Sequence, residues 1–223
     1  SNIQGSDYFV SYFTTRRGME NVLYVAKNEP LEPVQHHLLS FFANNIAVSH
    51  ENLKLREVIR DSQRELSYII GEAVELRSKE TGSHVRRVAH ISALLARHYG
   101  LPDNEAEMIK LASPLHDVGK VAIPDLILNK PGPHTDEERQ IMQTHAKAGF
   151  DMLRKSDNPI LQLGATIALE HHECWDGSGY PDRLKGEDIP LGSRVIALAE
   201  AFVNLEEKGL KENNPYTREQ IYK

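Results

Sequence analysis

Hydrophobic and polar residues alternate near the start of the chain and follow helical spacing over the rest. Residues 8–14 and 22–26 alternate roughly between apolar and polar side chains around the polar stretch RRGME, which predicts a short β-hairpin. Two strands alone are only marginally stable. We therefore interpret the hairpin as the remnant of a sensor domain whose remainder lies upstream, or as an edge that a partner completes.

A long helical pattern follows the hairpin, from residue 33 to about residue 79. After Pro33 it contains no proline and a single glycine, Gly71. A periodic helix much longer than about 25 residues is typical of a coiled coil or a signalling linker. We expect a parallel dimer along this helix, and the alternative is two helices broken near Ser49 or Gly71 that pack on one monomer. Positions at steps of three or four are Leu55, Val58, Ser62, Leu66, Ile69, Ala73 and Leu76.

The remaining residues predict five helices separated by proline and glycine. Thr135 followed by Glu138 is a capping-box pattern, and Pro159 suits a first helical turn. No strand pattern of comparable strength appears after residue 30, so the fold class is mainly α. Two long loops, 118–134 and 174–190, have a length that is usually functional in a compact domain. The helices are expected at about 82–99, at 104–116, from Thr135, from Pro159 and after Pro190.

Length and composition are those of a globular chain. With 223 residues, 40% of them hydrophobic, it can hold one large domain, or a domain and a fragment, around a buried core. The net charge of −6 and a pI near 6.0 provide no broad basic field, so neither a nucleic acid polymer nor a membrane is an expected partner. A phosphate-bearing ligand would therefore be small and held by a local site.

One cysteine cannot form an intrachain disulfide, and 11 histidines beside it favour imidazole chemistry in a reducing compartment. No stretch approaches the roughly 18 apolar residues of a membrane span. The opening residues SNIQGS lack the features of a signal peptide and are interpreted as a cloning remnant. A cytoplasmic location is the expectation.

The candidate chemistry consists of histidines and acids at helix ends and on apolar faces. Glu80 and His84 are four residues apart and so share a helix face. Glu200 interrupts the apolar run VIALAEAFV, where a buried carboxylate needs a partner. Imidazole and carboxylate without thiolate are typical of hydrolytic or iron and manganese centres rather than structural zinc. The other candidate ligands are His116, Asp117, His145, His171 and His172.

Each of these residues alone also has an ordinary structural interpretation. A single histidine such as His145 is more often a satisfied core or surface residue, and Glu200 alone could extend to solvent at a helix end. The adjacent His116 and Asp117 before glycine and lysine are more specific. The histidine pair before WDGSGYP is more specific again, and together these features favour a metal site.

The stretches HDVGK at 116–120, MQTHAKAG around His145 and HHECWDGSGYP at 171–181 resemble the HD-GYP subgroup of the HD phosphohydrolases. The resemblance covers about residues 70–202, and the upstream part is weakly similar to the end of a GAF-like sensor domain joined to a signalling helix. It implies an HD-type helical bundle. The domains so expected are a hairpin remnant of a GAF-like domain at 1–32, a signalling and dimerisation helix at 33–79 and an HD-GYP domain at 80–223 that lacks its closing helices.

The family encloses two or three divalent metal ions and hydrolyses cyclic di-GMP to linear pGpG or GMP. The resemblance implies that Asp117 bridges two metals, that Glu80 serves a third, and that Lys120 neutralises charge on the phosphate. A bridged metal pair lowers the pKa of bound water and clamps phosphate oxygens. The implied metal ligands are His84, His116, Asp117 and Glu200 on one ion, and Asp117, His145, His171 and His172 on the other. The implied substrate-binding residues are Lys120, Trp175, Asp176, Gly179, Tyr180, Arg183 and Lys185.

This chain departs from the family on its last metal-binding helix. Glu200 and Val203 stand where relatives usually carry aspartates, and Asn214 and Thr217 replace basic residues that hold phosphate. A valine cannot bind a metal, so two metals are expected and a third is not. Fe or Mn is favoured ahead of Ni, Mg or Zn.

Two functional hypotheses lead, ahead of an HD hydrolase that acts on another nucleotide. The first is a metal-dependent cyclic di-GMP phosphodiesterase with Asp117 and Lys120 as catalytic residues, dimeric through the long helix and coupled to an upstream sensor or receiver domain. The second is a catalytically impaired HD-GYP domain that binds cyclic di-GMP or a protein partner without turnover. The substitutions at Glu200, Val203, Asn214 and Thr217 motivate the second hypothesis.

Overall fold

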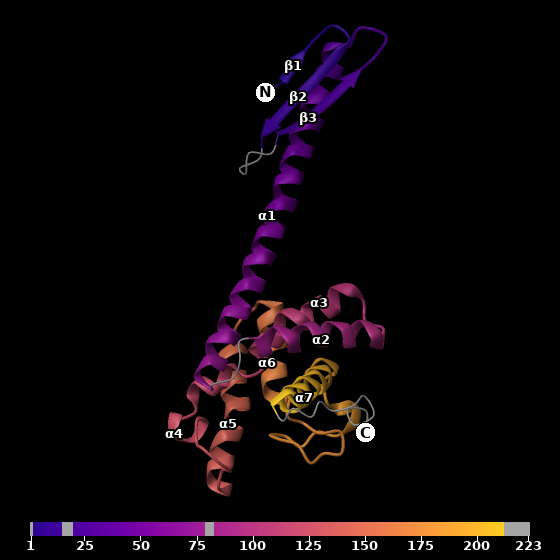
Figure 1. Ribbon diagram of the computed structural model, residues 1–223. Coiled ribbons are helices and arrows are strands. Elements are labelled where there is room, and N and C mark those ends of the chain that lie inside the picture. Colours follow the sequence, from indigo (N-terminus) through magenta and orange to yellow (C-terminus); the bar gives the residue numbers. More distant parts are fainter. Residues whose placement is uncertain (1, 15–19, 79–82, 212–223) are drawn as a thin grey trace. The chain divides into compact units, whose positions relative to one another are not determined.

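The computed structural model describes residues 2–14, 20–78 and 83–211 (Figure 1). The chain divides into two compact units, residues 1–63 and residues 64–223. The fold class is mainly α, as predicted, with one small sheet. None of the helices in the described ranges combines the length and apolarity that a membrane crossing requires.

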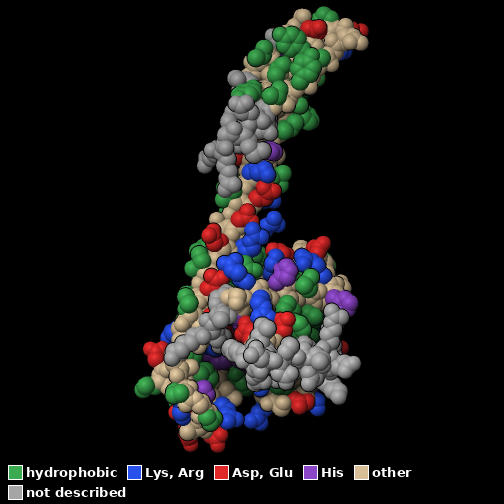
Figure 2. Space-filling model, in the orientation of Figure 1, with side chains coloured by type: hydrophobic (Ala, Val, Ile, Leu, Met, Phe, Trp, Pro, Cys, Tyr) green, Lys and Arg blue, Asp and Glu red, His purple; other side chains and the backbone are tan. Residues whose placement is uncertain are grey.

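The first unit holds an antiparallel sheet in the order β1 (Asn2–Gln4), β2 (Tyr8–Thr14) and β3 (Glu20–Ala26). The predicted hairpin is therefore confirmed, with Phe9 opposite Val25. The third strand, β1, was not predicted because three residues are too few to show alternation. Phe9 on β2 and Ala43 on the first part of α1 are almost fully buried, so the sheet covers one side of the helix within this unit. Figure 2 shows hydrophobic side chains gathered on the exposed face of this unit.

The helix α1 runs without a break from Pro33 to Arg77 and contributes residues to both units. The alternative of two helices broken near Ser49 or Gly71 is wrong. Gly71 lies inside the helix, where an added Cβ would stand 2.5 Å from the carbonyl oxygen of Pro114. Glycine at this position therefore allows the last turns of α1 to pack closely against the backbone at Pro114, within the second unit.

The second unit is built from helices whose bounds lie close to the predicted ones. Its core lies between α2, α3, α6 and α7, where Val88, Ile109, Ile167, Ile196 and Val203 are buried together. The helices are α2 (Ser83–Tyr99), α3 (Asp103–Ala112), α4 (Asp125–Leu128), α5 (Asp136–Leu153), α6 (Pro159–Glu170) and α7 (Leu191–Lys211).

Two helix starts follow the predicted capping chemistry. The N–H of Glu138 donates to Thr135 Oγ1 at 3.3 Å, and the N–H of Thr135 donates to Glu138 Oε2 at 2.8 Å, which completes the capping box of α5. Pro159 occupies the first turn of α6 after the N-cap residue Asn158. Each start is fixed by residues adjacent in the sequence.

One predicted helix end is wrong. The helix expected at 104–116 ends at Ala112, and Ser113–Leu115 forms a 3₁₀ turn. Pro114 has no N–H, so the α-helical hydrogen-bond pattern cannot continue through it. The tighter turn carries His116 and Asp117 out of the helix and toward α5. The long loop at 118–134 also contains structure, a 3₁₀ turn at Val118–Ala122 and the short helix α4.

Candidate metal centre

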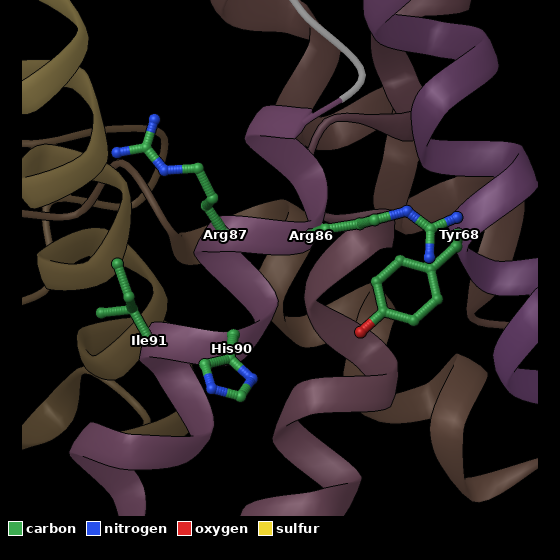
Figure 3. Close-up of a pocket in the computed structure, with 5 residues that line it drawn as sticks. All are labelled: Tyr68, Arg86, Arg87, His90 and Ile91. Atoms are coloured by element: carbon green, nitrogen blue, oxygen red, sulfur yellow. The ribbon is translucent and has the colours of Figure 1, made fainter.

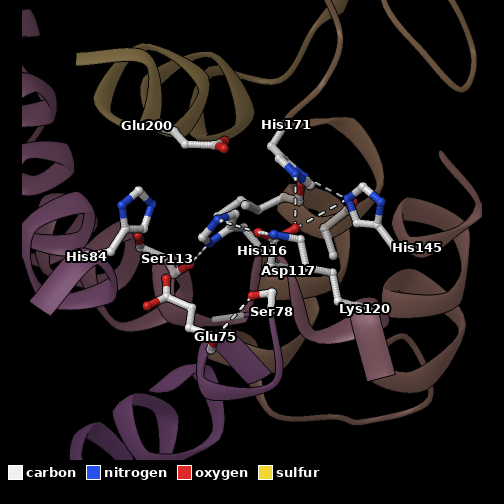
Figure 4. Close-up of polar contacts among 12 residues, drawn as sticks. Glu75, Ser78, His84, Ser113, His116, Asp117, Lys120, His145, His171 and Glu200 are labelled. Carbon is white, nitrogen blue, oxygen red and sulfur yellow. Dashed lines mark hydrogen bonds and ion pairs between the residues drawn. The ribbon is translucent and has the colours of Figure 1, made fainter. Parts of the chain in front are cut away.

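Four residues from three segments of the second unit bring their ligand atoms together. The carboxylate of Asp117 and the imidazoles of His145, His171 and His172 offer atoms that all lie within 4.8 Å of one another. Asp117 lies between two 3₁₀ turns, His145 lies on α5, and the His pair follows α6. In Figure 4 the imidazoles of His116, His145 and His171 converge on Asp117, with Glu200 reaching over from α7.

Close backbone packing places Asp117 beside His145. An added Cβ at Gly119 would stand only 1.9 Å from the carbonyl oxygen of His145. Glycine is therefore required for the turn at 118–122 to approach α5. This explains why the sequence HDVGK carries glycine two residues after the acid.

Three histidines share one orientation, set by their own helical turns. In His116, His145 and His171, Nδ1 donates to a backbone carbonyl three or four residues earlier, at 2.8, 2.7 and 3.0 Å. A ring nitrogen that donates to a carbonyl carries the proton of the neutral imidazole, so the other nitrogen carries a lone pair. In the neutral form of each imidazole, Nε2 therefore presents a lone pair to the centre of the cluster, and His116 reaches this form by losing the proton that it shares with Asp117.

These Nε2 atoms face a carboxylate across a short gap. They lie 3.3 Å (His116), 3.3 Å (His145) and 3.8 Å (His171) from Asp117 oxygens. Among the described residues, Nε2 of all three histidines and Oδ1 of Asp117 are buried and form no hydrogen bond. Two ligand atoms that each bind one ion at about 2.1 Å, at right angles, lie about 3 Å apart. The residues present therefore fit a divalent cation between them.

The pKa values of His116 and Asp117 are coupled, and each group stabilises the charged form of the other. Burial opposes protonation of His116, but the adjacent Asp117 carboxylate outweighs it and raises the pKa of His116 to about 9. Burial likewise opposes the charge of Asp117, yet His116 and Lys120 hold the pKa of Asp117 well below its usual range. The cluster therefore keeps an ionised carboxylate at its centre.

The other three histidines of the cluster, His145, His171 and His172, are neutral. Neutral imidazole is the form that binds metals. Burial, followed by the neighbouring imidazoles, lowers the pKa of His171 well below its ordinary value and that of His172 to about 3. Burial also lowers the pKa of His145. Three uncharged imidazoles around one carboxylate form an electron-pair donor set of the kind predicted from the sequence.

A cavity of about 260 Å³ opens onto the cluster. Lys120 lines it, and its Nζ lies 2.7 Å from Asp117 Oδ2. Tyr180 forms another wall, with its ring stacked on His172 at a centroid distance of 4.7 Å. Burial raises the pKa of Tyr180, so its phenol stays protonated. The cavity is lined by Ser78, Asp117, Lys120, Leu128, Met142, His145, His172, Tyr180 and Glu200.

Glu173 holds the loop that carries Tyr180, a role that the sequence did not reveal. Its buried carboxylate accepts three backbone N–H groups, from Asp182 at 2.7 Å, Arg183 at 3.0 Å and Leu184 at 3.0 Å. A carboxylate satisfied by three amides fixes the path of the chain after the turn. The feature of the sequence that could have indicated this role is the position of Glu173 directly after His171 and His172.

The ligands predicted on the α2 side do not all join the cluster. His84 on α2 is buried, but its Nδ1 lies 3.4 Å from Glu207 Oε1 on α7, and it is outside the group of four. Glu80, Asn214 and Thr217 lie outside the described residues. Val203 is fully buried in the apolar core, where it offers no ligand.

Glu75 was not predicted as part of this region. This residue near the end of α1 is only 1% exposed, and Figure 4 shows it on the same side of the cluster as His84. No clear signal in the sequence marked this acid, because Glu75 stands in the run GEAVELR among other charged residues of the same helix. It adds a second acid to the α2 side of the site.

Several predicted residues of the 174–190 loop lie away from the cavity. Trp175 is 61% exposed, and its ring faces the guanidinium of Arg194 at 5.7 Å. Asp176 closes the turn, since its Oδ1 accepts from the N–H and the hydroxyl of Ser178 at 2.9 and 2.6 Å. Lys185 is exposed and does not line the cavity.

The remaining loop residues shape the turn or a second cavity. An added Cβ at Gly179 would stand 2.4 Å from the backbone nitrogen of Cys174, so this glycine lets the turn fold back on itself. Arg183 lines a separate polar groove beside the turn. Of the aromatic residues predicted to contact a base, Tyr180 is the one that lines the metal cavity.

A further cavity of about 400 Å³ lies between the end of α1 and α2 (Figure 3). Arg86 covers the ring of Tyr68 at 4.8 Å and pairs with Glu72 at 2.6 Å. Arg87 pairs with two acids on α7, one of them Glu207 at 3.1 Å. Because carboxylates already neutralise both guanidinium groups, this cavity is not a candidate phosphate site. It is lined by Tyr68, Arg86, Arg87, His90 and Ile91.

Residues 69–221 match the HD domain family. The chain belongs to this family, and its motifs are those of the HD-GYP subgroup. Residues 1–79 match a family described as a domain of unknown function, DUF3369. The predicted GAF-like origin of the upstream part therefore stays a prediction.

Three relatives illustrate the family. The 3′3′-cGAMP-specific phosphodiesterase 2 of Vibrio cholerae is 46% identical over 217 residues, which are 96% of this chain and 41% of the relative. The cyclic di-GMP phosphodiesterase response regulator RpfG of Xanthomonas campestris is 44% identical and covers 65% of this chain and 38% of its own length. The cyclic di-GMP phosphodiesterase of Thermotoga maritima is 47% identical and covers 62% and 38%. The chain thus spans about two fifths of these relatives.

Proposed function

We propose that this chain is the metal-dependent phosphodiesterase module of a signalling protein and that it hydrolyses a cyclic purine dinucleotide. The observation that carries the proposal is the set of buried Nε2 atoms that face Asp117 without a hydrogen bond among the described residues. The relatives, named as cyclic di-GMP and 3′3′-cGAMP phosphodiesterases, support the substrate class. Cyclic di-GMP is the substrate that the motifs favour, and 3′3′-cGAMP is a second candidate because the relative that matches 96% of the chain is named for it.

The proposed cofactor is a pair of divalent ions, Fe or Mn ahead of Ni, Mg or Zn. Asp117, His145, His171 and His172 would hold them, with His116 and Glu200 at the edge of the cluster. When bound, such ions supply a hydroxide near neutral pH and a Lewis acid for the phosphate oxygens. A third ion is not proposed, because Val203 contributes no ligand.

The chain's own residues complete the chemistry. Lys120 places an ammonium group at the cavity wall, where it can neutralise charge that develops on a phosphate oxygen. Tyr180 keeps its proton and can donate it in a hydrogen bond to the substrate. Leu128 and Met142 line the same cavity and exclude water from part of it. Lys120 and Asp117 are therefore the proposed catalytic pair.

The test is anaerobic loading with Fe(II) or Mn(II), followed by hydrolysis assays on both nucleotides with Asp117→Ala beside the wild-type protein. We expect product formation that depends on metal and falls at least about 1000-fold in the variant, because the metals supply several kcal/mol of transition-state stabilisation. Metal analysis of both proteins provides a reading independent of activity. A loaded wild-type protein no faster than Asp117→Ala would overturn the proposal.

A module that binds without turnover is the second candidate function. The observation in its favour is Val203, which is fully buried in the core at the position where the family resemblance predicts an aspartate. Calorimetry with the metal-loaded protein separates the two functions. Nucleotide binding at micromolar concentration with no product after prolonged incubation would favour the second.

We also propose that α1 forms a parallel homodimer. From Val34 to Leu76, the positions reached by alternating steps of four and three residues are apolar or small polar residues. This spacing is a heptad pattern. Nine large hydrophobic side chains on this stripe are 48–72% exposed: Val34, Leu38, Phe41, Val48, Leu55, Ile59, Leu66, Ile69 and Leu76. The stripe differs in part from the predicted one, since it includes Ile59 and omits Val58.

A second copy of the chain is the occupant that fits this stripe. In the second unit, α1 buries Tyr68, Gly71 and Val74 on the opposite face, so its own chain does not cover the stripe there. Two asparagines, Asn45 and Asn52, lie within the stripe, and polar residues at such positions specify register and a two-stranded state. The proposed dimer explains both the exposed residues and their spacing.

Analytical ultracentrifugation of Leu55→Asp tests the dimer. We expect the wild-type chain to sediment as a dimer and the variant as a monomer, because a carboxylate in the seam would be buried against its copy. Arg60→Asp, outside the stripe, is the matched control and should stay dimeric. A monomeric wild-type chain at micromolar concentration would rule the dimer out.

The upstream input domain and the cytoplasmic location stay predictions.

A further inference from the structure

A polar groove of about 500 Å³ lies between α5 and the turn at 177–183. Its α5 wall consists of residues at steps of three and four, which share one helix face. The opposite wall includes Ser178, Tyr180 and Arg183. The residues from α5 are Gln140, Gln143, Thr144 and Lys147.

The groove adjoins the metal cavity through one aromatic ring. Tyr180 lines both hollows, stacks on His172 and lies 6.4 Å from the ring of His145 between centroids. A nucleotide carries its base on the sugar next to the phosphate. A phosphodiester placed at the metal cluster would therefore have a base close to Tyr180, the residue that both hollows share.

The groove is built to hold its shape on the turn side. Arg183 has a φ of 57°, a left-handed conformation that non-glycine residues adopt uncommonly. The buried Glu173 carboxylate holds this backbone through the N–H of Arg183 and its two neighbours. The direction in which the Arg183 side chain leaves the turn is thus fixed by a buried contact.

Two carboxamides distinguish this groove chemically. Gln143 is half-buried and Gln140 is exposed, one helical turn apart on the same wall. A carboxamide offers an NH2 donor group and a carbonyl acceptor side by side, which match N7 and the amino group of adenine, whereas guanine presents two acceptors, N7 and O6, on the same edge that suit Arg or Lys. Lys147 already contacts the carboxylate of Asp151 at 3.7 Å and covers the Phe150 ring at 4.8 Å.

We propose that this groove is a base-recognition subsite and that Gln140 and Gln143 select adenine. The inference rests on the proposed function and makes it more specific, since it favours a mixed substrate with one adenine and one guanine, such as 3′3′-cGAMP, over cyclic di-GMP. Arg183 is the group that accommodates guanine in the same groove. Loss of the carboxamides shifts the preference toward the guanine-only substrate.

The test compares kcat/KM for 3′3′-cGAMP with kcat/KM for cyclic di-GMP, in the wild-type protein and in the double variant Gln140→Ala, Gln143→Ala. We expect the ratio to fall at least about 5-fold, since the discrimination of a good bidentate pair between bases corresponds to about 5- to 150-fold. The ratio is independent of the fraction of folded or metal-loaded protein, because both substrates are measured on one preparation. Gln162→Ala, on the exposed side of α6, is the matched control and should leave the ratio unchanged.

A conversion variant gives a second reading. Gln143→Arg places a second guanidinium in the groove and should favour cyclic di-GMP relative to the wild-type protein. Ratios within about twofold of wild type in both variants would refute the subsite. If the wild-type protein turns over neither nucleotide, the proposed function fails by itself, and the same ratio taken from equilibrium dissociation constants still decides on the groove.

Discussion

The two sides of the candidate metal site differ in how firmly the protein orients their side chains. On the α5 and α6 side, His145 and His171 are buried and neutral, and their Nε2 atoms face Asp117. On the α2 and α7 side, His84 contacts Glu207, and Glu200 is only partly buried. The first side uses backbone carbonyls to orient its imidazoles, and the second uses a carboxylate on another helix. Ligands fixed within their own helical turn are therefore preorganised, whereas those fixed across helices depend on the packing of α7.

The largest expected effect tests this difference directly. We expect His171→Ala to lower metal content and to reduce phosphodiesterase activity at least about 1000-fold. The variant lacks a preorganised ligand, and the metals supply several kcal/mol of transition-state stabilisation. His84→Ala should reduce activity by only about 10- to 100-fold, as outer positions around metals do. Metal analysis and initial rates on both variants provide the measurement. Equal losses would contradict the comparison and place His84 among the primary ligands.

A smaller effect is expected at Glu200, where the family resemblance predicts an aspartate. Glu200→Ala should lower activity about 10- to 100-fold, while Glu200→Asp, which restores the usual family residue, should keep or raise it. The shorter side chain keeps the charge, so a gain would mean that the extra methylene places the carboxylate imperfectly. Initial rates at saturating metal measure this. An inactive Glu200→Asp would show that α7 has adapted to the longer acid.

The smallest effect concerns the loop rather than the ligands. Glu173→Gln replaces one of two acceptor oxygens with an amide and should lower the free energy of unfolding by about 1 to 3 kcal/mol. For a chain of this size that is roughly 2 to 4 °C in Tm for each kcal/mol. Thermal unfolding of the metal-free protein measures it without reference to activity. Glu187→Gln, exposed in the same loop, serves as the control and should leave Tm unchanged.

The capping signals and the histidine motifs were sufficient to predict much of the second unit. Thr135 with Glu138 and Pro159 placed two helix starts, because capping involves residues that are close in the sequence. Pro114 shortened a predicted helix, and the same turn delivers Asp117 to the cluster. The third strand was missed because it pairs with β2 through tertiary contacts rather than through any pattern of its own.

The sequence by itself determined the helical class, the family and the residues that are candidates for metal binding, since periodicity, caps and motif order are local properties. Only the tertiary structure decided which candidates meet. It brought Asp117, His145, His171 and His172 within reach of one ion, left Trp175 exposed and assigned Glu173 to the loop. The reason is physical: a distance between helices depends on how closely their backbones pack, as at Gly119, and that packing involves residues far apart in the chain.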